Sequence, residues 1–288
     1  MRALATPNDS PKTVYETCIN SIANTDLRDR LNLVTPNILV AAGDYEQKAK
    51  AKQLYSIPSN NCKNHEIALG GVTKKELKDV YSSHMVDRAK PARAIYDLLL
   101  SQAPLGRCPF CGFGQVSTLD HYLPKAKYPQ LSVLPLNLIP SCRDCNTGKS
   151  DAIATTAEEQ SLHPYFDHQN FIDDQWLYAE VRKTKPATIY FFVKAPEQWD
   201  NISKTRVQSH FNAFNLALRY SLEAGNEMVS LRDILVNYSK SMGSHSVKKL
   251  LEIEAKSFTG RHSNSWETAM YQALASSDWY CDGDGGFL

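Results

Sequence analysis

The segments CPFC, residues 108–111, and CRDC, residues 142–145, decide how the middle of this chain folds. Each carries two cysteines in C-x-x-C spacing, and two such pairs supply the four thiolates of a tetrahedral Zn²⁺ site. A redox dithiol is the alternative, but it requires only one pair. We therefore predict a zinc site formed by Cys108, Cys111, Cys142 and Cys145. Because four cysteines fill the tetrahedron, the ion is expected to be structural.

The 30 residues between the two cysteine pairs exceed the spacing of a plain zinc ribbon. They contain LDHYLPK, residues 119–125, in which Asp120 stands beside His121. The alternating run QVSTL precedes this pair and Pro124 follows it, so we expect the pair at the end of a strand, where both side chains can turn toward one pocket. After the second cysteine pair we expect a helix that begins near Arg143.

The segment from residue 108 to residue 149 resembles the zinc-knuckle branch of the HNH (ββα-metal) endonucleases. The motifs that carry the resemblance are CPFC, LDHYLPK, PLNLIPSC and CRDCNTGK. A softer similarity includes KPARAIYDLLL before this segment and HPYFD after it. Stand-alone bacterial HNH proteins, among them the nuclease subunit of Septu-type phage defence, share this pattern.

The resemblance implies roles for four residues. His121 would be the general base that takes a proton from the attacking water. Asp120 and Asn146 would hold one catalytic Mg²⁺ or Mn²⁺, and Asn137 would orient the loop and the imidazole. Some family members have histidine where this chain has Asn146. A carboxylate with an amide oxygen favours Mg²⁺ or Mn²⁺ over Zn²⁺ or Ni²⁺.

Local charge favours a phosphate-bearing substrate. Five basic and two acidic side chains between residues 107 and 149 leave a local charge of +3, in a chain whose formal net charge is +1. Lys149 and Arg143 flank Asn146, and we predict that they contact backbone phosphates. Lys125 and Lys127 either contact phosphate as well or belong to the solvated surface.

His163, in HPYFD, has two interpretations. It could add a metal ligand or a phosphate contact to the site. Alternatively it is a structural histidine beside Pro164.

The predicted fold class is α+β and mostly helical. A central ββα-metal (HNH) module, stabilised by the Cys₄ zinc site, is expected at 104–170. A helical region precedes it at 1–103, and a β-hairpin with a further helical region follows at 171–288. Helix signals include Ser-Pro at 10–11, Thr-Pro at 35–36 and a capping box at 73–76. QWLYAEVRK and ATIYFFVK indicate the hairpin, and the last residues, SSDWYCDGDGGFL, a loose tail.

Together these patterns predict a metal-dependent HNH endonuclease that cleaves nucleic acid, with DNA favoured, in bacterial anti-phage defence. An RNA-cleaving HNH nuclease is one alternative. Another is a catalytically inactive zinc module that only binds nucleic acid. Resemblance to defence nucleases suggests an ATPase partner. The first residues have no apolar signal segment, and no apolar run approaches the roughly 20 residues of a membrane span, so we expect a cytoplasmic protein without a membrane partner.

Overall fold

The computed structural model describes residues 1–148, 153–243 and 245–282. Across these ranges helix predominates, and the named strands pair into three two-stranded antiparallel sheets. This confirms the α+β, mostly helical class. The chain divides into two compact units: an N-terminal unit, Arg2–Asp167, and a C-terminal unit, Met1 together with His168–Leu288. The regions predicted at 1–103 and 104–170 therefore lie almost entirely within one unit.

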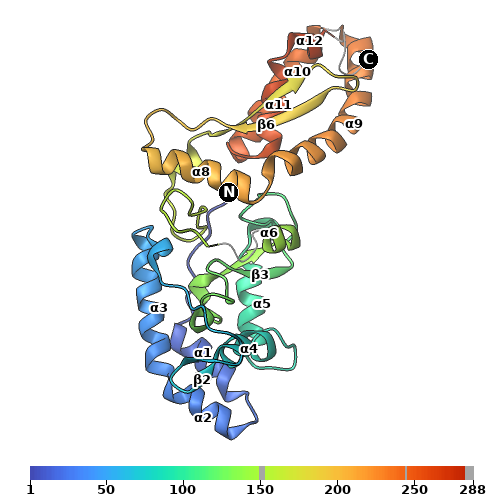
Figure 1. Ribbon diagram of the computed structural model, residues 1–288. Helices are drawn as coiled ribbons and strands as arrows, with labels where there is room; N and C mark the ends of the chain where they lie inside the picture. Colours follow the sequence, from blue (N-terminus) through green and yellow to red (C-terminus); the bar gives the residue numbers. More distant parts are fainter. Residues whose placement is uncertain (149–152, 244, 283–288) are drawn as a thin grey trace. The chain divides into compact units, whose positions relative to one another are not determined.

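The N-terminal unit combines helices with two small sheets (Figure 1). Its α-helices are α1 (Pro11–Asn20), α2 (Thr25–Leu33), α3 (Thr35–Lys50), α4 (Lys74–His84), α5 (Arg93–Ser101) and α6 (Arg143–Gly148). Its strands are β1 (Ile67–Leu69), β2 (Val72–Thr73), β3 (Thr118–His121) and β4 (Leu138–Ser141). Short 3₁₀ turns are η1 (Leu54–Ser56), η2 (Pro104–Gly106), η3 (Pro129–Leu131) and η4 (Pro135–Asn137).

Side-chain caps set the start of two of these helices. The Ser10 hydroxyl accepts a hydrogen bond from the Thr13 N–H at 3.1 Å, so the predicted start of α1 is confirmed. The predicted capping box at the start of α4 is also present. The predicted cap at Thr35 is wrong. Thr35 is already helical, and Val34 stands at the N-cap of α3 without a side-chain cap.

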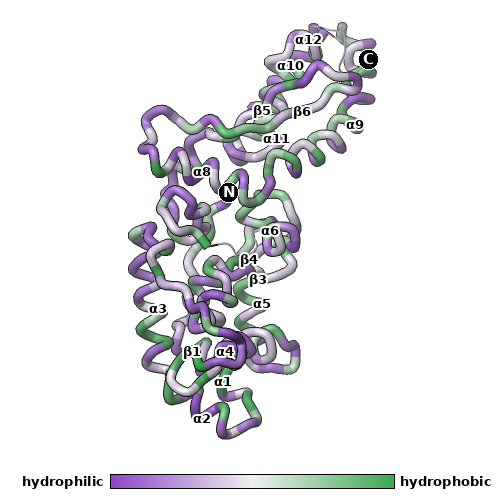
Figure 2. The backbone as a smooth tube through the Cα atoms, viewed as in Figure 1, coloured by the Kyte–Doolittle hydropathy of each residue, from purple (hydrophilic) through white to green (hydrophobic). Residues whose placement is uncertain are grey.

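The hydrophobic core of the N-terminal unit joins its helices to the β3–β4 pair. Apolar residues of α1, α4 and α5 pack in one cluster with Leu119 of β3 and Leu138 of β4. Figure 2 shows hydrophobic and hydrophilic turns alternating along α3, as expected for a helix with one buried face. Because Leu119 is anchored in this core, the two residues that follow it in β3 are fixed at the edge of a packed helical body.

The C-terminal unit builds helices around one hairpin. Its elements are α7 (Asn170–Asp173), β5 (Leu177–Arg182), β6 (Thr188–Val193), α8 (Asn201–Ala213), α9 (Leu216–Met242), α10 (His245–Arg261), α11 (Trp266–Ala275) and α12 (Asp278–Cys281). The predicted hairpin is confirmed as β5–β6, which packs against α9 and α11 (Figure 1). Ile189 and Phe191 are buried on its inner face.

Part of the predicted loose tail is helical. Asp278–Cys281 form α12, and Tyr280 and Cys281 are buried. Apolar contacts of these two side chains hold the segment; the rest of the predicted tail, residues 283–288, lies outside the described residues. None of the helices described for this chain is both long enough and apolar enough to cross a membrane.

Candidate functional site

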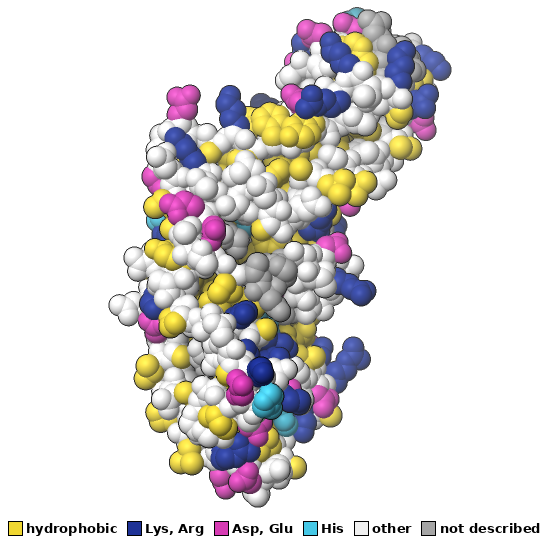
Figure 3. Space-filling view, viewed as in Figure 1, with side chains coloured by type: hydrophobic (Ala, Val, Ile, Leu, Met, Phe, Trp, Pro, Cys, Tyr) yellow, Lys and Arg dark blue, Asp and Glu magenta, His cyan; other side chains and the backbone are white. Residues whose placement is uncertain are grey.

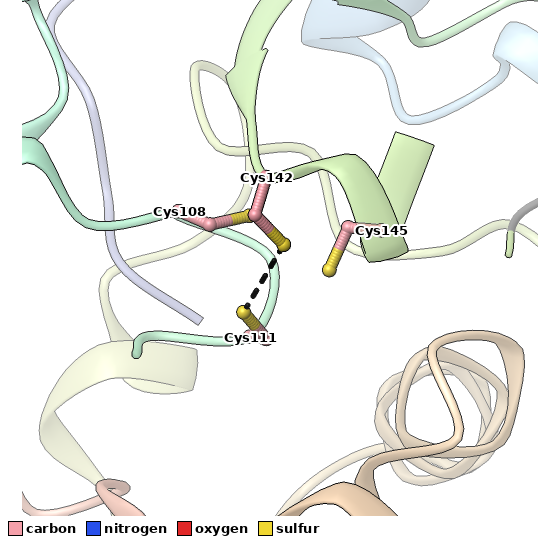
Figure 4. A group of neighbouring side chains, drawn as sticks. All are labelled: Cys108, Cys111, Cys142 and Cys145. Carbon is pink, nitrogen blue, oxygen red and sulfur yellow. Dashed lines mark hydrogen bonds between the residues drawn. The ribbon is translucent and has the colours of Figure 1, made fainter. Parts of the chain in front are cut away.

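Four cysteine side chains converge in the N-terminal unit (Figure 4). Cys108 and Cys111 lie in the turn after η2, Cys142 follows β4, and Cys145 lies in the first turn of α6. All four are buried, and their sulfur atoms lie within 4.8 Å of one another. The Sγ atoms of Cys111 and Cys142 are 3.9 Å apart. The predicted convergence of the two C-x-x-C pairs is confirmed.

This donor set fits Zn²⁺. A tetrahedron with Zn–S bonds of about 2.3 Å places its sulfur atoms about 3.8 Å apart, close to the observed spacing. Burial raises the pKa of the Cys108 thiol, so the cluster alone disfavours several thiolates in so small a volume. A divalent cation removes that cost, because metal coordination deprotonates thiols. The cluster can therefore hold zinc, and four sulfur ligands leave no open position for chemistry.

Gly114 completes the surroundings of this cluster. Its N–H donates to Cys111 Sγ at 3.3 Å, and its carbonyl accepts from the Cys108 N–H at 2.8 Å. A Cβ atom at this position would lie 2.7 Å from Cys142 Sγ. Gly114 is not among the predicted site residues, although it stands three positions after Cys111 in CPFCGFG.

The β3–β4 pair carries the Asp-His pair on one strand and leads into the second cysteine pair from the other. In the antiparallel register Asp120 faces Ile139 and His121 faces Leu138, so both residues remain within the ladder. Strand β3 ends at His121, as predicted. β4 leads into α6, which packs against β3. The side chains of Asp120 and His121 are both buried.

The backbone of Ser132 holds the imidazole of His121. His121 Nε2 lies 2.8 Å from the Ser132 carbonyl oxygen. Since a carbonyl only accepts, Nε2 must carry the proton, and in the neutral ring the lone pair is on Nδ1. The Ser132 hydroxyl in turn donates to the Leu77 carbonyl of α4 at 2.8 Å. The orientation of the imidazole thus depends on α4.

Tyr81 packs against His121. Its ring meets the His121 ring edge-on, with centroids 4.4 Å apart, and its hydroxyl donates to the Leu119 carbonyl at 3.1 Å. Burial raises the pKa of Tyr81, and the Asp120 carboxylate adds to the rise. Burial also raises the pKa of Tyr45, with a smaller contribution from Asp120. Both residues pair within the β3–β4 ladder, where neighbouring side chains point to opposite faces, so the expectation that Asp120 and His121 both turn toward one pocket stays a prediction.

Asn137 fixes the loop that follows His121. It is fully buried, its Oδ1 accepts from the Leu123 N–H at 2.7 Å, and its Nδ2 donates to the Leu123 carbonyl at 3.1 Å. Nδ2 also lies 3.3 Å from the Leu131 carbonyl. Leu123 follows His121 closely and Leu131 precedes Ser132, so one amide ties together both ends of the loop that carries the imidazole and its carbonyl partner.

The remaining predicted substrate and metal residues lie on or after α6. Asn146 is partly exposed, and its N–H donates to the Cys142 carbonyl at 3.1 Å, so the zinc cluster and Asn146 share one helical turn. Arg143 is exposed at the start of α6. Lys149 lies outside the described residues.

His163 is held by protein groups at both ring nitrogens. Nδ1 accepts from the Tyr165 N–H at 3.2 Å, and Nε2 lies 3.0 Å from the Tyr45 hydroxyl. The Tyr45 hydroxyl donates its proton to the Leu136 carbonyl at 3.2 Å, so its oxygen accepts the hydrogen bond from His163 Nε2–H. The Tyr122 ring lies 4.1 Å from the His163 ring, centre to centre. These contacts favour the structural interpretation of His163 over that of a ligand.

Comparison with known proteins places the chain in a family. Protein ea31 of Escherichia phage lambda is 32% identical over 292 aligned residues, which cover 96% of this chain and 98% of that protein. The chain belongs to the ea31 family. Because the similarity spans nearly the whole length, both units lie within what the ea31 family shares. The name ea31 itself describes no activity. No family model matches the chain, and no solved structure matches it.

Proposed function

We propose that this member of the ea31 family is a metal-dependent nuclease that hydrolyses phosphodiester bonds of DNA, with His121 as its general base. One observation carries the proposal: the hydrogen bond of 2.8 Å between His121 Nε2 and the Ser132 carbonyl. It fixes the tautomer in which Nδ1 is the proton acceptor. A neutral imidazole held in one orientation is what general-base catalysis requires.

In this proposal the protein's own groups move one proton. His121 Nδ1 takes it from the attacking water, a contribution on the order of 10²–10⁴ in rate. The resulting imidazolium keeps its Nε2–H on the Ser132 carbonyl, which stabilises the positive charge. Asn137 maintains the geometry, because its amide holds the loop between His121 and Ser132.

Asp120 and Asn146 are the residues that would hold the catalytic cation. Their carboxylate and amide oxygens are hard ligands, the type that Mg²⁺ and Mn²⁺ prefer. The packing of α6 on β3 supports their joint use. When bound, the cation supplies charge neutralisation at the scissile phosphate and the leaving oxygen. Arg143, exposed at the start of α6, is assigned to the phosphate backbone.

The test is cleavage of supercoiled plasmid by the full chain loaded with zinc, in the presence of Mg²⁺ or Mn²⁺. We expect nicking that chelation of the added cation abolishes. His121→Ala should reduce the rate by about 10²-fold or more. The matched control is His245→Ala, because His245 is exposed in the other unit.

Each result of this test has a defined meaning. If a folded His121→Ala protein cleaves plasmid at nearly the wild-type rate, His121 is not the general base. Cleavage of structured RNA but not of plasmid would replace the DNA substrate by RNA. If the zinc-loaded protein binds nucleic acid but cuts none, the chain is a binding module and the proposal is wrong.

The resemblance to defence nucleases also supports a role in bacterial anti-phage defence with an ATPase partner, and both stay predictions. Co-purification of the full chain from its native host tests them. An ATPase that elutes with the chain is the expected result.

A further inference from the structure

Three lysines lie close to α4 and to the segment that precedes β1. We call them the lysine cluster: Lys78, Lys125 and Lys127. Figure 3 shows several basic side chains around α4, with acidic and histidine side chains among them. Lys78 Nζ donates to Asn64 Oδ1 at 3.2 Å. Lys127 Nζ lies 3.4 Å from Asn61 Oδ1. The two asparagines stand three residues apart in one loop, so they bring the two ammonium groups to the same surface.

The side-chain partners of the lysine cluster in the described residues are neutral. Each ammonium donates to a neutral side-chain oxygen, and Lys125 does so to Ser82 Oγ at 2.9 Å. Within residues 1–148, 153–243 and 245–282 none of the three forms an ion pair with a carboxylate. Asp79 is the carboxylate whose field reaches Lys125, but it is paired with Lys75. An ammonium has three donors, so each retains capacity for a further acceptor.

The surroundings of Lys125 disfavour its charged form. Partial burial lowers its pKa, and repulsion from Lys78 lowers it further. Its Nζ lies over the Tyr81 ring, 4.6 Å from the centroid, which offsets part of this effect. A bound anion would stabilise the charged form of Lys125, because it would lie close to both Lys125 and Lys78.

The lysine cluster adjoins the proposed general base. The Tyr81 ring contacts both Lys125 Nζ and the His121 ring. Lys125 Nζ lies 4.6 Å and the imidazole centre 4.4 Å from the same ring centre, so the two are no more than about 9 Å apart. One DNA strand advances about 3.4 Å per nucleotide along the helix axis. The separation of Lys125 and His121 thus corresponds to no more than about two to three nucleotides of axial rise, so one strand can reach both.

We propose that the lysine cluster binds the phosphodiester backbone of duplex DNA and holds one strand against His121. This inference rests on the proposed function, which it deepens by naming the residues that position the substrate. The occupant is assigned from charge: three cations that form no ion pair within the described residues complement a row of phosphates. Contacts of this kind read no bases, so binding is independent of sequence.

The experiment measures binding to a short fluorescein-labelled duplex by anisotropy, using the full-length, zinc-loaded chain. All proteins carry His121→Ala and no divalent cation is added, so the probe is not consumed. The test variant combines Lys78→Gln, Lys125→Gln and Lys127→Gln. The matched control, Lys12→Gln with Lys48→Gln and Lys50→Gln, removes the same charge from lysines already paired with carboxylates.

We expect the test variant to bind at least about 10-fold more weakly than the control. The slope of log affinity against log salt should be shallower by about 0.9 for each phosphate that the variant no longer neutralises. Replacing the same three lysines by arginine should retain binding, because the charge remains. Zinc content and the unfolding midpoint confirm that every variant is folded.

Two results overturn the inference. One is equal affinity and salt slope for the test variant and the control. The other is tighter binding of poly-glutamate than of duplex to the cluster, which would assign it to an acidic protein. Neither depends on catalysis. If wild-type protein cuts no plasmid but the lysine cluster binds duplex, only the proposed function fails.

Discussion

Gly114 lies against the cysteine cluster at a position with no space for a side chain. In Gly114→Ala the added methyl carbon would lie 2.7 Å from the Sγ atom and 2.9 Å from the Cβ atom of Cys142. Cys142 cannot move away without leaving the metal geometry. We expect less zinc retained after gel filtration, and a loss of on the order of 1–3 kcal/mol in the free energy of unfolding. Metal analysis and urea denaturation measure the two effects.

Gly43→Ala is the matched control for this substitution. Gly43 lies within α3, and a Cβ there would meet nothing within 4 Å. Alanine should stabilise the helix by about 1 kcal/mol and leave the zinc content unchanged. Full zinc occupancy with unchanged stability in Gly114→Ala would contradict the packing described around Cys142.

The sequence predicts some of the site's residues and cannot predict others. The four cysteines are found from their local spacing, because each pair needs only one tight turn. Ser132 could not be found, because it acts through its main-chain carbonyl, which every residue possesses. Tyr81 could not be found either, because 40 residues separate it from His121 and the contact arises from tertiary packing.

An ion pair between α2 and α4 reinforces the start of α4. Arg30 of α2 donates to both carboxylate oxygens of Glu76, at 2.7 and 3.0 Å. The same carboxylate accepts from the Thr73 N–H at 2.8 Å in the capping box. These bonds, with that of Arg30 foremost, lower the pKa of Glu76 to about 2. They fix the helix that carries Leu77 and Tyr81.

The low pKa of Glu76 predicts how stability depends on pH. In the unfolded chain a glutamate has a pKa of about 4.3. The stabilisation that the ionised Glu76 contributes is therefore complete above that pH and is lost as the pH falls toward about 2. Glu76→Gln keeps a capping partner but removes the charge. We expect it to lower the free energy of unfolding by about 1 kcal/mol at neutral pH, since solvent screens the pair. Urea denaturation of both proteins at several pH values should show the difference shrinking below about pH 4.3.

A partly exposed glutamate serves as the control. Glu16 lies 3.8 Å from Lys12 on α1, and Glu16→Gln should change stability little. A Glu76→Gln difference that stays constant from neutral pH to about pH 3 would mean that Arg30 does not stabilise the carboxylate.

Local signals predict elements well where one segment decides the outcome. The capping box of α4 and the β5–β6 hairpin have this property, since their residues are close in sequence. The Thr35 cap failed because α2 ends at Leu33 and α3 begins at Thr35, so only Val34 separates them. The chain has no room for an extended cap there, a consequence of helix packing that the Thr-Pro signal does not contain.

The zinc cluster and the tryptophans belong to different units. The cysteines lie in the N-terminal unit, at residues 108–145. The chain's four tryptophans all lie in the C-terminal unit: Trp176, Trp199, Trp266 and Trp279. Trp176 and Trp199 are buried, so their fluorescence reports the unfolding of that unit. Circular dichroism reports the helices of both.

Loss of zinc should therefore destabilise one unit and not the other. Cys142→Ser removes one of four ligands, and we expect the variant to lose zinc and its N-terminal unit to unfold at lower urea concentration, because metal binding contributes folding free energy. The circular-dichroism transition should then split, while the tryptophan transition keeps the wild-type midpoint. Cys62→Ser, outside the cluster, should retain zinc and both midpoints. A tryptophan transition that shifts together with the circular-dichroism transition would show that the two units unfold as one.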